Sequence, residues 1–298
     1  SGLSAAIKLK QLSKKSNKEL SVCVIEKGSE VGAHIVSGAV IETKALDELI
    51  PDWNEKNCPL KTKAKNDKFL YLTEAKSYQL PTPPQMHNKG NYIVSLSDFS
   101  KWLAEQAEAL EVEIYPGFSA SEVLFNDKNK VIGVATCDMG RLKDGSEGPN
   151  FEQGIELHAK QTIFSEGCRG HLGKILMEKF NLNAENSPQT YGIGIKELWE
   201  IQPDKSNPGS IMHTTGWPLN AETYGGSFLY HLDNNKISIG FVIGLDYKNP
   251  YLSPYMEFQR FKHHPEIKKI LEGGRRINYG ARALNEGGIQ SLPKLTFP

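Results

Sequence analysis

The sequence predicts two fold classes in succession, an α/β region followed by an α+β region built on antiparallel strands. The α/β prediction rests on a helix over residues 4–16, opened by small residues, and on a β-branched strand over 20–26 that ends on Glu26. The α+β prediction rests on four later stretches that alternate like antiparallel strands with one face on a core. These stretches are 191–199, 211–217, 227–232 and 237–245.

Composition limits the classes of protein to consider. The 298 residues, 39% of them hydrophobic, suffice for one large or two ordinary domains. A formal net charge of zero argues against nucleic acid as the main partner. The longest apolar run, 237–245, is half a membrane span, so no helix is expected to cross a bilayer. Four separated cysteines predict no metal site and suit a reducing compartment; they are Cys23, Cys58, Cys137 and Cys168.

The first helix and strand are typical of the second half of a dinucleotide-binding βαβ unit. Gly2 and Ser4 at the helix N-terminus would face a pyrophosphate, and Glu26, 24 residues after Gly2 (26 − 2), would accept hydrogen bonds from ribose hydroxyls. Because the chain starts at Ser1, we expect the preceding strand and the first two glycines of the motif to be missing. The alternative is an ordinary αβ unit in which Gly2 serves helix packing and Glu26 is a surface acid.

The remaining elements follow from periodicity and from turn and cap signals. Pro51 ends a short helix that begins near Thr43, Ser97 caps a longer helix, and Ser253-Pro254 starts another. Residues 78–86 are predicted to be extended because they contain three prolines. Residues 140–153 are predicted to be a loop. Further helices are expected over 172–180 and 265–271, and further strands over 69–72, 91–94, 112–115, 119–125, 131–137, 155–158, 161–165 and 277–284.

Two later motifs add candidate binding residues. The strand 161–165 leads into Glu166-Gly167 and then a helix, which repeats the phosphate-binding geometry, although acid-glycine steps after strands are frequent. Tyr224-Gly225-Gly226 places two glycines at the mouth of a strand. They indicate either a β-bulge or turn, or the close approach of a flat ligand to the backbone.

The proline-rich loop presents apolar side chains that it cannot all bury, and either a membrane surface, a partner or the loop's own core would cover them. These side chains are Leu80, Pro81, Pro83, Pro84 and Met86. No nucleophile–base pattern and no pair of acids stands out, so no catalytic side chain is assigned. That absence favours a flavin or nicotinamide cofactor, which carries its own redox chemistry.

Six segments together carry a resemblance to a known family. They are 1–6, 24–27, 32–38, 224–231, 244–254 and 280–288. With these residues the chain resembles the electron-transfer flavoprotein–ubiquinone oxidoreductase family, essentially end to end. The resemblance implies an FAD-binding domain of the glutathione-reductase/hydroxylase type and a discontinuous, antiparallel-sheet ubiquinone-binding domain. The implied division is 1–68, 93–188 and 281–298 for FAD, and 69–92 and 189–280 for ubiquinone.

The resemblance also assigns roles to residues. It implies that Gly2, Ser4, Glu26 and Lys27 contact the adenosine diphosphate half of FAD. It places Ser37, Gly38, Glu166 and Gly167 toward the ribityl and flavin half. Tyr224, Gly225 and Gly226 match the family's quinone contact, and loop 78–86 matches its membrane-contacting hairpin.

The implied activity is electron transfer from reduced electron-transfer flavoprotein to ubiquinone at a membrane surface, with no nucleic acid involved. The resemblance implies a 4Fe-4S cluster in the full-length protein only, with ligands beyond Pro298, so this chain is expected to be an inactive fragment. A bacterial cytoplasmic membrane and the mitochondrial inner membrane both stay open. Two alternatives remain: an FAD-dependent hydroxylase or isoprenoid-lipid reductase that uses a nicotinamide, and a non-catalytic flavoprotein subunit that docks partners.

Overall fold

The structure, a computed structural model, describes residues 1–296 and divides into two compact units. Unit 1 comprises Ser1–His34, Leu103–Ser187 and the segment from Ile289; unit 2 comprises Ile35–Trp102 and Pro188–Gly288. Unit 2 therefore takes in 35–68, 93–102 and 281–288, which the sequence-based division assigned to the FAD-binding domain. The last two residues of the predicted segment 281–298 lie outside the described residues. Which unit binds which ligand stays a prediction.

Unit 1 begins with the predicted helix–strand pair. Helix α1 (Gly2–Ser16) begins two residues before the predicted range of 4–16 and ends where that range ends; Asn17 follows with a left-handed φ of 49°, which stops the helix. Strand β1 (Cys23–Glu26) is shorter than predicted and pairs in parallel with β7 (Glu113–Pro116). Ile7 in α1 and Ala107 are fully buried, so the apolar stripe of α1 faces the core of this unit.

The rest of unit 1 consists of short antiparallel sheets and helix α4 (His171–Lys179). Strands β8 (Ala120–Phe125), β9 (Val131–Thr136) and β12 (Glu156–His158) form one sheet in the order β12-β9-β8. The prediction of a loop over 140–153 is wrong. Strands β10 (Met139–Arg141) and β11 (Glu147–Glu152) form a hairpin there, because backbone pairing needs no apolar alternation. The prediction of a strand over 161–165 is also wrong, because these residues join no sheet.

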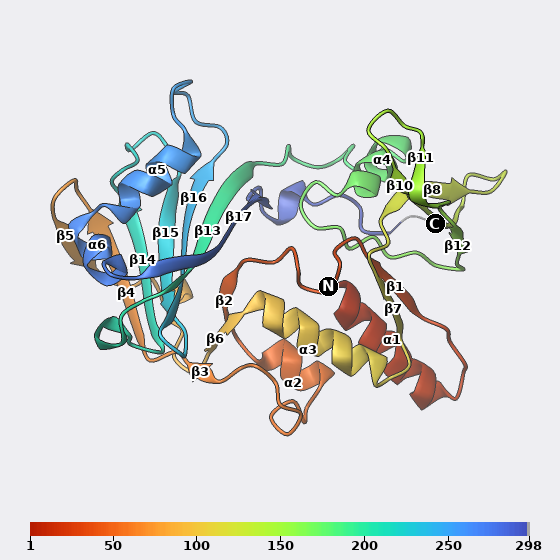
Figure 1. Cartoon of the computed structure of the whole chain (residues 1–298), viewed down its shortest axis with the longest axis horizontal. Coiled ribbons are helices and arrows are strands. Elements are labelled where there is room, and N and C mark those ends of the chain that lie inside the picture. The colour runs from red at the N-terminus through yellow and green to blue at the C-terminus, as the bar shows by residue number, and fades with distance from the viewer. Residues whose placement is uncertain (297–298) are drawn as a thin grey trace. The chain divides into compact units, whose positions relative to one another are not determined.

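Unit 2 is built on a mixed sheet of seven strands. Its six strand pairs are all antiparallel except the parallel pair of β14 with β4. In sheet order the strands are β17 (Arg275–Asn285), β13 (Tyr191–Glu200), β16 (Lys236–Gly244), β15 (Gly225–His231), β14 (Ser210–Gly216), β4 (Asn66–Leu72) and β5 (Ser77–Leu80). Figure 1 shows this order across the unit.

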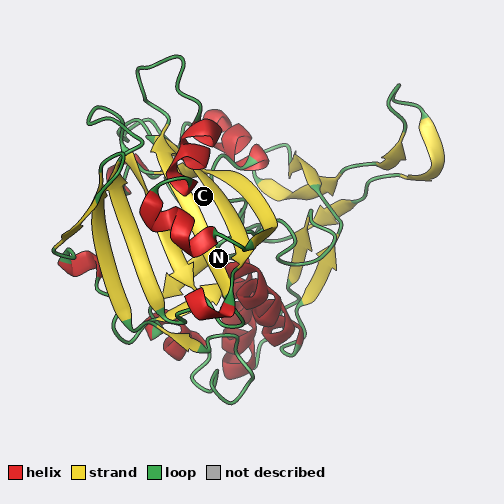
Figure 2. Ribbon diagram, turned by 60° about the vertical axis from the view of Figure 1, so that its left-hand side comes forward, coloured by secondary structure: helices red, strands yellow, loops and turns green. Residues whose placement is uncertain are grey.

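Helices α5 (Pro254–Lys262) and α6 (Pro265–Leu271) cover one face of this sheet, here called the helical face (Figure 2). Phe258 and Phe261 of α5 are fully buried and pack against Phe241 of β16, with 5.3 Å between the Phe241 and Phe261 ring centroids. Ser253 caps α5 as predicted, accepting a hydrogen bond from the Met256 N–H. The largest apolar core of unit 2 therefore lies on the helical face.

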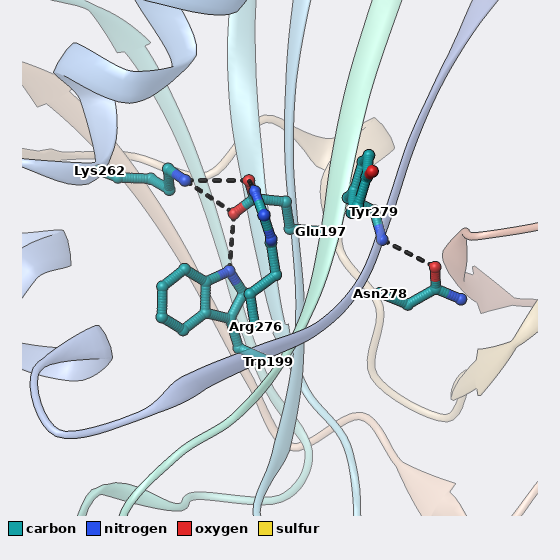
Figure 3. A network of polar contacts seen from close by, with 6 residues as sticks. All are labelled: Glu197, Trp199, Lys262, Arg276, Asn278 and Tyr279. Carbon is teal, nitrogen blue, oxygen red and sulfur yellow. Dashed lines mark hydrogen bonds and ion pairs between the residues drawn. The ribbon is translucent and has the colours of Figure 1, made fainter.

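A buried carboxylate joins α5 to the sheet on this face. Glu197 of β13 is 2% exposed, and each of its carboxylate oxygens lies 2.9 Å from the Lys262 ammonium. Arg276 and the Trp199 indole N–H also donate to it, at 3.2 and 2.7 Å (Figure 3). Since strand residues alternate between faces, Lys196 and the other even-numbered residues of β13 point to the opposite face, here called the second face.

A small sheet of β2 (Gly38–Ile41), β6 (Tyr92–Ser95) and β3 (Thr62–Lys63) completes unit 2 together with α2 (Lys44–Leu49). Strand β6 runs directly into α3 (Leu96–Glu108), so the prediction that Ser97 caps this helix is wrong. The Asp98 N–H donates instead to the Ser95 hydroxyl, at 3.3 Å. Three short 3-10 turns occupy Pro84–Met86, Pro203–Lys205 and Ile289–Ser291.

Candidate functional site

The N-terminus of α1 carries the first two candidates, Gly2 and Ser4. A Cβ atom at Gly2 would lie 3.3 Å from the Cβ of Ser165, so the helix start packs against the residue that precedes Glu166. The structure thus brings two of the predicted contacts, Gly2 and the Glu166-Gly167 step, into one neighbourhood of unit 1. No side chain caps α1, and its first N–H groups are available to an anion.

Glu26 ends β1 as predicted and is half-buried, whereas Lys27 is exposed. One carboxylate oxygen, Oε1, accepts a hydrogen bond of 2.7 Å from the N–H of Gly28 and so stabilises the turn after the strand. In the described part of the chain no hydrogen bond reaches Oε2. A carboxylate oriented by one oxygen and open at the other can accept a hydrogen bond from a hydroxyl donor such as a ribose.

Glu166 has a structural role that sequence reasoning missed. Its carboxylate accepts hydrogen bonds from the N–H groups of Leu172, at 3.1 Å, and Gly173, at 2.7 Å, so it caps α4. The sequence signal that could have predicted this capping role was an acidic residue a few positions before the start of a helix. Gly167 follows with a φ of 75°, a conformation that suits glycine, and its backbone is exposed.

Ser37 and Gly38 lie in unit 2, against the second face of the large sheet. The N–H of Gly38 donates to the hydroxyl of Ser238, at 3.1 Å, and a Cβ at Gly38 would lie only 2.8 Å from the Cβ of Ser238. Glycine is therefore required for this close approach. The hydroxyl of Ser37 accepts a hydrogen bond of 2.6 Å from the ammonium of Lys196.

Lys196 is a candidate that the sequence did not reveal. It is half-buried on β13, and burial together with the nearby charge of Arg282 lowers its pKa. The only signal in the sequence was a lysine within a strand of alternating apolar residues, after Gly192 and Gly194.

Tyr224, Gly225 and Gly226 stand at the start of β15. Tyr224 is 69% exposed. A Cβ at Gly225 would lie 2.4 Å from the Val242 carbonyl oxygen, and one at Gly226 would lie 2.6 Å from that of Thr214. The pairing of β15 with β14 and β16 shows no register shift, so the two glycines serve close strand contacts and form no bulge.

Two carboxyl groups lie beside Tyr224. A Cβ at Gly192 would lie 2.5 Å from Oε1 of Glu286, and one at Gly244 would lie 2.9 Å from Asp246 and 3.4 Å from Tyr224. Gly192 and Gly244 are register partners, so both acids occupy one end of the sheet. Burial, and then the charge of Asp246, raise the pKa of Glu286.

The proline-rich loop is exposed or half-buried throughout. Pro81 and Pro84 are exposed, and Leu80, Pro83 and Met86 are half-buried. The prediction of an extended segment holds for β5 but is wrong for Pro84–Met86, which form a 3-10 turn. Asn88 anchors the end of the loop through two hydrogen bonds to Asp67, of 3.0 and 2.6 Å.

Within residues 1–296, no helix is both long and apolar enough to cross a membrane. No three of the histidine, cysteine, aspartate and glutamate side chains described gather as metal ligands would. The four cysteines are free thiols. A shallow charged depression between α2 and the turn at Lys89-Gly90 contains none of the predicted site residues.

The fold is that of FAD-dependent flavoproteins. It superposes on a geranylgeranyl bacteriochlorophyll reductase-like protein from Thermoplasma acidophilum with a TM-score of 0.66 and 16% identity, over 95% of this chain and 63% of that one. It superposes on aklavinone-11 hydroxylase, solved in a ternary complex with FAD and aklavinone, with a TM-score of 0.61 and 12% identity, over 95% and 51%. At these identities the likeness shows the fold alone: an oxidoreductase/hydroxylase-type flavoprotein fold.

Sequence comparison narrows this class. Residues 191–284 match a family described as ETF-QO, ubiquinone-binding. The whole chain is 61% identical to an electron transfer flavoprotein-ubiquinone oxidoreductase, mitochondrial, of Dictyostelium discoideum and 57% identical to that of Sus scrofa, covering 49% of each. The chain belongs to the electron transfer flavoprotein-ubiquinone oxidoreductase family, and it spans about half the length of these curated relatives.

Proposed function

We propose that the full-length protein transfers electrons from reduced electron-transfer flavoprotein to ubiquinone. The observation that carries the proposal is the 61% identity, sustained over all 298 residues, to a relative that bears this activity in its name. The match of residues 191–284 to the ubiquinone-binding family supports the second half of the reaction. Such a match covers most of the seven-stranded sheet of unit 2.

FAD is the proposed cofactor. When bound, it would accept and release the electrons, which the side chains of this chain cannot do. The polar groups described above fit it: free N–H groups at Gly2 and Ser4, a ribose acceptor at Glu26, and Lys27 beside it. Ser37, Gly38, Glu166 and Gly167 are proposed to meet the ribityl and flavin half, with the carboxylate of Glu166 retained by α4 and its backbone facing the cofactor.

The quinone ring is proposed to lie against Tyr224, Gly225 and Gly226. The exposed Tyr224 ring supplies apolar area, and the two half-buried glycines have no side chain of their own to keep a ligand from their backbone. A larger residue at Gly226 would press on the Thr214 carbonyl, so Tyr224 is the better position for a test. Tyr224→Ala should slow quinone reduction while leaving the reduction of the protein by its donor unchanged.

Membrane contact is proposed for the loop that contains Leu80, Pro81, Pro83, Pro84 and Met86. The exposed Tyr71 and Tyr78 lie on the same strand pair and extend the apolar surface. Since the curated relatives are named as mitochondrial, we propose the mitochondrial inner membrane. Leu80→Asp should reduce flotation of the full-length protein with liposomes, whereas Gln85→Asp, an exposed polar position in the same loop, should not.

The decisive experiment uses the full-length protein. Reduced electron-transfer flavoprotein is mixed with it anaerobically, and reduction of a soluble ubiquinone analogue is followed. Rapid quinone reduction supports the proposal. Reduction by NADPH but not by the flavoprotein donor would favour a nicotinamide-dependent hydroxylase or lipid reductase, and absence of any quinone reduction would favour a docking subunit. Chemical analysis for iron and sulfide tests the proposed 4Fe-4S cluster, whose ligands are expected outside this chain.

A further inference from the structure

Two cations lie next to each other on the second face of the seven-stranded sheet. Lys196 of β13 is opposite Gly280 of β17, and Arg282 of β17 is opposite Gly194 of β13. In an antiparallel pair, residues that are opposite each other point to the same face. Arg282 and Lys196 are therefore diagonal neighbours on one surface, close enough for the arginine to lower the pKa of the lysine.

The position of Lys196 is fixed by small residues around it. A Cβ at Gly194 would lie 3.4 Å from Cε of Lys196, so the lysine stem lies along the strand past that glycine. Gly280 lets Val36 approach to ordinary contact distance, and this holds Ser37 beside the sheet. The Ser37 hydroxyl then accepts the 2.6 Å hydrogen bond from the ammonium. A long, flexible side chain is thus held in one place.

Neither cation has a negative partner. The hydroxyl of Ser37 is neutral, and in the described part of the chain no ion pair reaches Lys196 or Arg282. The cations of the helical face differ, because Lys262 and Arg276 share the buried carboxylate of Glu197. A half-buried ammonium beside a like charge is unfavourable unless an anion compensates it.

We propose that Lys196 and Arg282, with Ser37 orienting the lysine, form an anion-binding site that holds a negatively charged group of FAD. The ligand class rests on the proposed function, in which Ser37 and Gly38 meet this cofactor. FAD offers two such groups, the pyrophosphate and the flavin ring, which gains negative charge on reduction. Both present oxygen or nitrogen acceptors to a lysine ammonium and an arginine guanidinium in the same way.

The test measures FAD binding and flavin redox potential, and not turnover. Full-length protein is deflavinated and titrated with FAD, with flavin fluorescence as the signal. Lys196→Met and Arg282→Gln should each raise the FAD Kd about tenfold or more, the usual loss for a hydrogen bond to a charged group. Lys196→Arg should restore most of the affinity because it keeps the charge. Lys236→Met, an exposed lysine at the start of β16, is the matched control and should leave the Kd unchanged.

The midpoint potential of bound flavin distinguishes the two FAD groups. A lower potential in Lys196→Met and Arg282→Gln assigns the cations to the flavin ring, whereas a weaker Kd at unchanged potential assigns them to the pyrophosphate. Wild-type Kd and potential in both variants overturn the inference. Because Arg282 is exposed, Arg282→Gln should fold even if Lys196→Met does not. Quinone reduction by the wild-type protein is measured separately. If the wild type does not reduce quinone but the variants still change the FAD Kd or the potential, only the proposed function is overturned.

Discussion

The two units of this chain reach stability in different ways. Unit 2 has one continuous seven-stranded sheet, with a core on its helical face that includes Phe241, Phe258 and Phe261. Unit 1 has a pair of two-stranded sheets and one three-stranded sheet among its described residues. Its polar candidate residues also hold local structure: Glu26 fixes a turn and Glu166 caps α4.

The way in which each charged side chain is partnered distinguishes structural charges from those proposed to bind a ligand. In unit 2 the buried charge Glu197 is fully partnered by protein, while Lys196 and Arg282 on the second face are not. In unit 1 the carboxylate of Glu26 is proposed both to hold the backbone and to meet a cofactor, whereas Glu166 holds α4 with its carboxylate and is proposed to meet the cofactor through its backbone. Trp53, Trp199 and Trp217 lie within unit 2, and Trp102 is its last residue before Leu103 of unit 1, so tryptophan fluorescence follows mainly the unfolding of unit 2.

The largest effect is expected at Glu197. Glu197→Gln keeps the shape and the bond from Trp199 but removes the charge, so Lys262, with a side chain only 12% exposed, loses its ionic partner. The free energy of unfolding should fall by about 3–5 kcal/mol, as for other broken buried ion pairs. Urea unfolding followed by tryptophan fluorescence measures it.

Glu200→Gln is the matched control for this variant. Glu200 lies on the same strand, and its ion pair with Arg275 is exposed, with side chains 45% and 78% accessible. Its loss should cost about 0–1 kcal/mol. Equal effects of the two substitutions would mean that burial adds nothing to the stabilisation by the Glu197 ion pairs. The contrast between buried and exposed ion pairs in unit 2 would then fail.

A pH-dependent effect is expected at His231 on β15. Burial, and then the charge of Lys68, lower its pKa to about 4, and its Nδ1 accepts a hydrogen bond of 3.2 Å from the Asn207 N–H. Between pH 6.5 and 4 the unfolded chain binds more protons at this residue, so unit 2 loses stability as the pH falls through that range. The loss should reach about 3 kcal/mol at pH 4.

The measurement compares wild type with His231→Gln, in which the amide oxygen replaces the imidazole acceptor. Urea unfolding by tryptophan fluorescence is repeated from pH 7 to pH 4. Other titrating groups contribute equally to both proteins, so the difference between the two curves belongs to His231. Parallel curves would show that the imidazole is not kept neutral in the folded unit.

Local patterns predicted most of unit 2 because its strands and helices are defined by near neighbours in sequence. The alternation in 191–199 and 237–245 and the Ser253-Pro254 cap were confirmed, since each is decided within a few residues. The β10–β11 hairpin was missed because most of its residues are charged, glycine or proline, and its two apolar residues, Met139 and Phe151, show no period. The parallel pairing of β4 with β14 joins distant segments and has no local signal.

The site was less predictable than the fold for the same reason. The motif search could find Glu26 and the glycines because a spacing defines them. Lys196 reaches Ser37 across 159 positions, and Glu197 reaches Lys262 across 65. Such contacts depend on which strands become neighbours, and that is decided by the packing of the whole unit. The capping role of Glu166 was missed because an acidic residue at this position can either accept hydrogen bonds from the N–H groups of a helix N-terminus or bind a ligand.

A moderate effect is expected at Glu166 in unit 1. Glu166→Ala removes two acceptors from the first turn of α4 and should destabilise that helix by about 1–2 kcal/mol. Hydrogen exchange of a peptide covering 171–179 measures the change, because α4 contains no tryptophan. Glu178→Ala, at an exposed position of α4, is the control and should leave exchange near Leu172 unchanged. Unchanged exchange in Glu166→Ala would contradict the capping role of its carboxylate.

The smallest effect is expected at Ser253, the corresponding cap in unit 2. Its hydroxyl accepts one hydrogen bond, from Met256, at the long distance of 3.5 Å, and Pro254 already presets the first helical turn. Helix α5 is held mainly by the burial of Phe258 and Phe261, so Ser253→Ala should cost about 0.5 kcal/mol, at the low end for N-caps. Urea unfolding followed by tryptophan fluorescence gives the value for unit 2. A loss at Ser253 larger than that at Glu166 would mean that local caps matter more where the core is large, which would reverse the comparison of the two units.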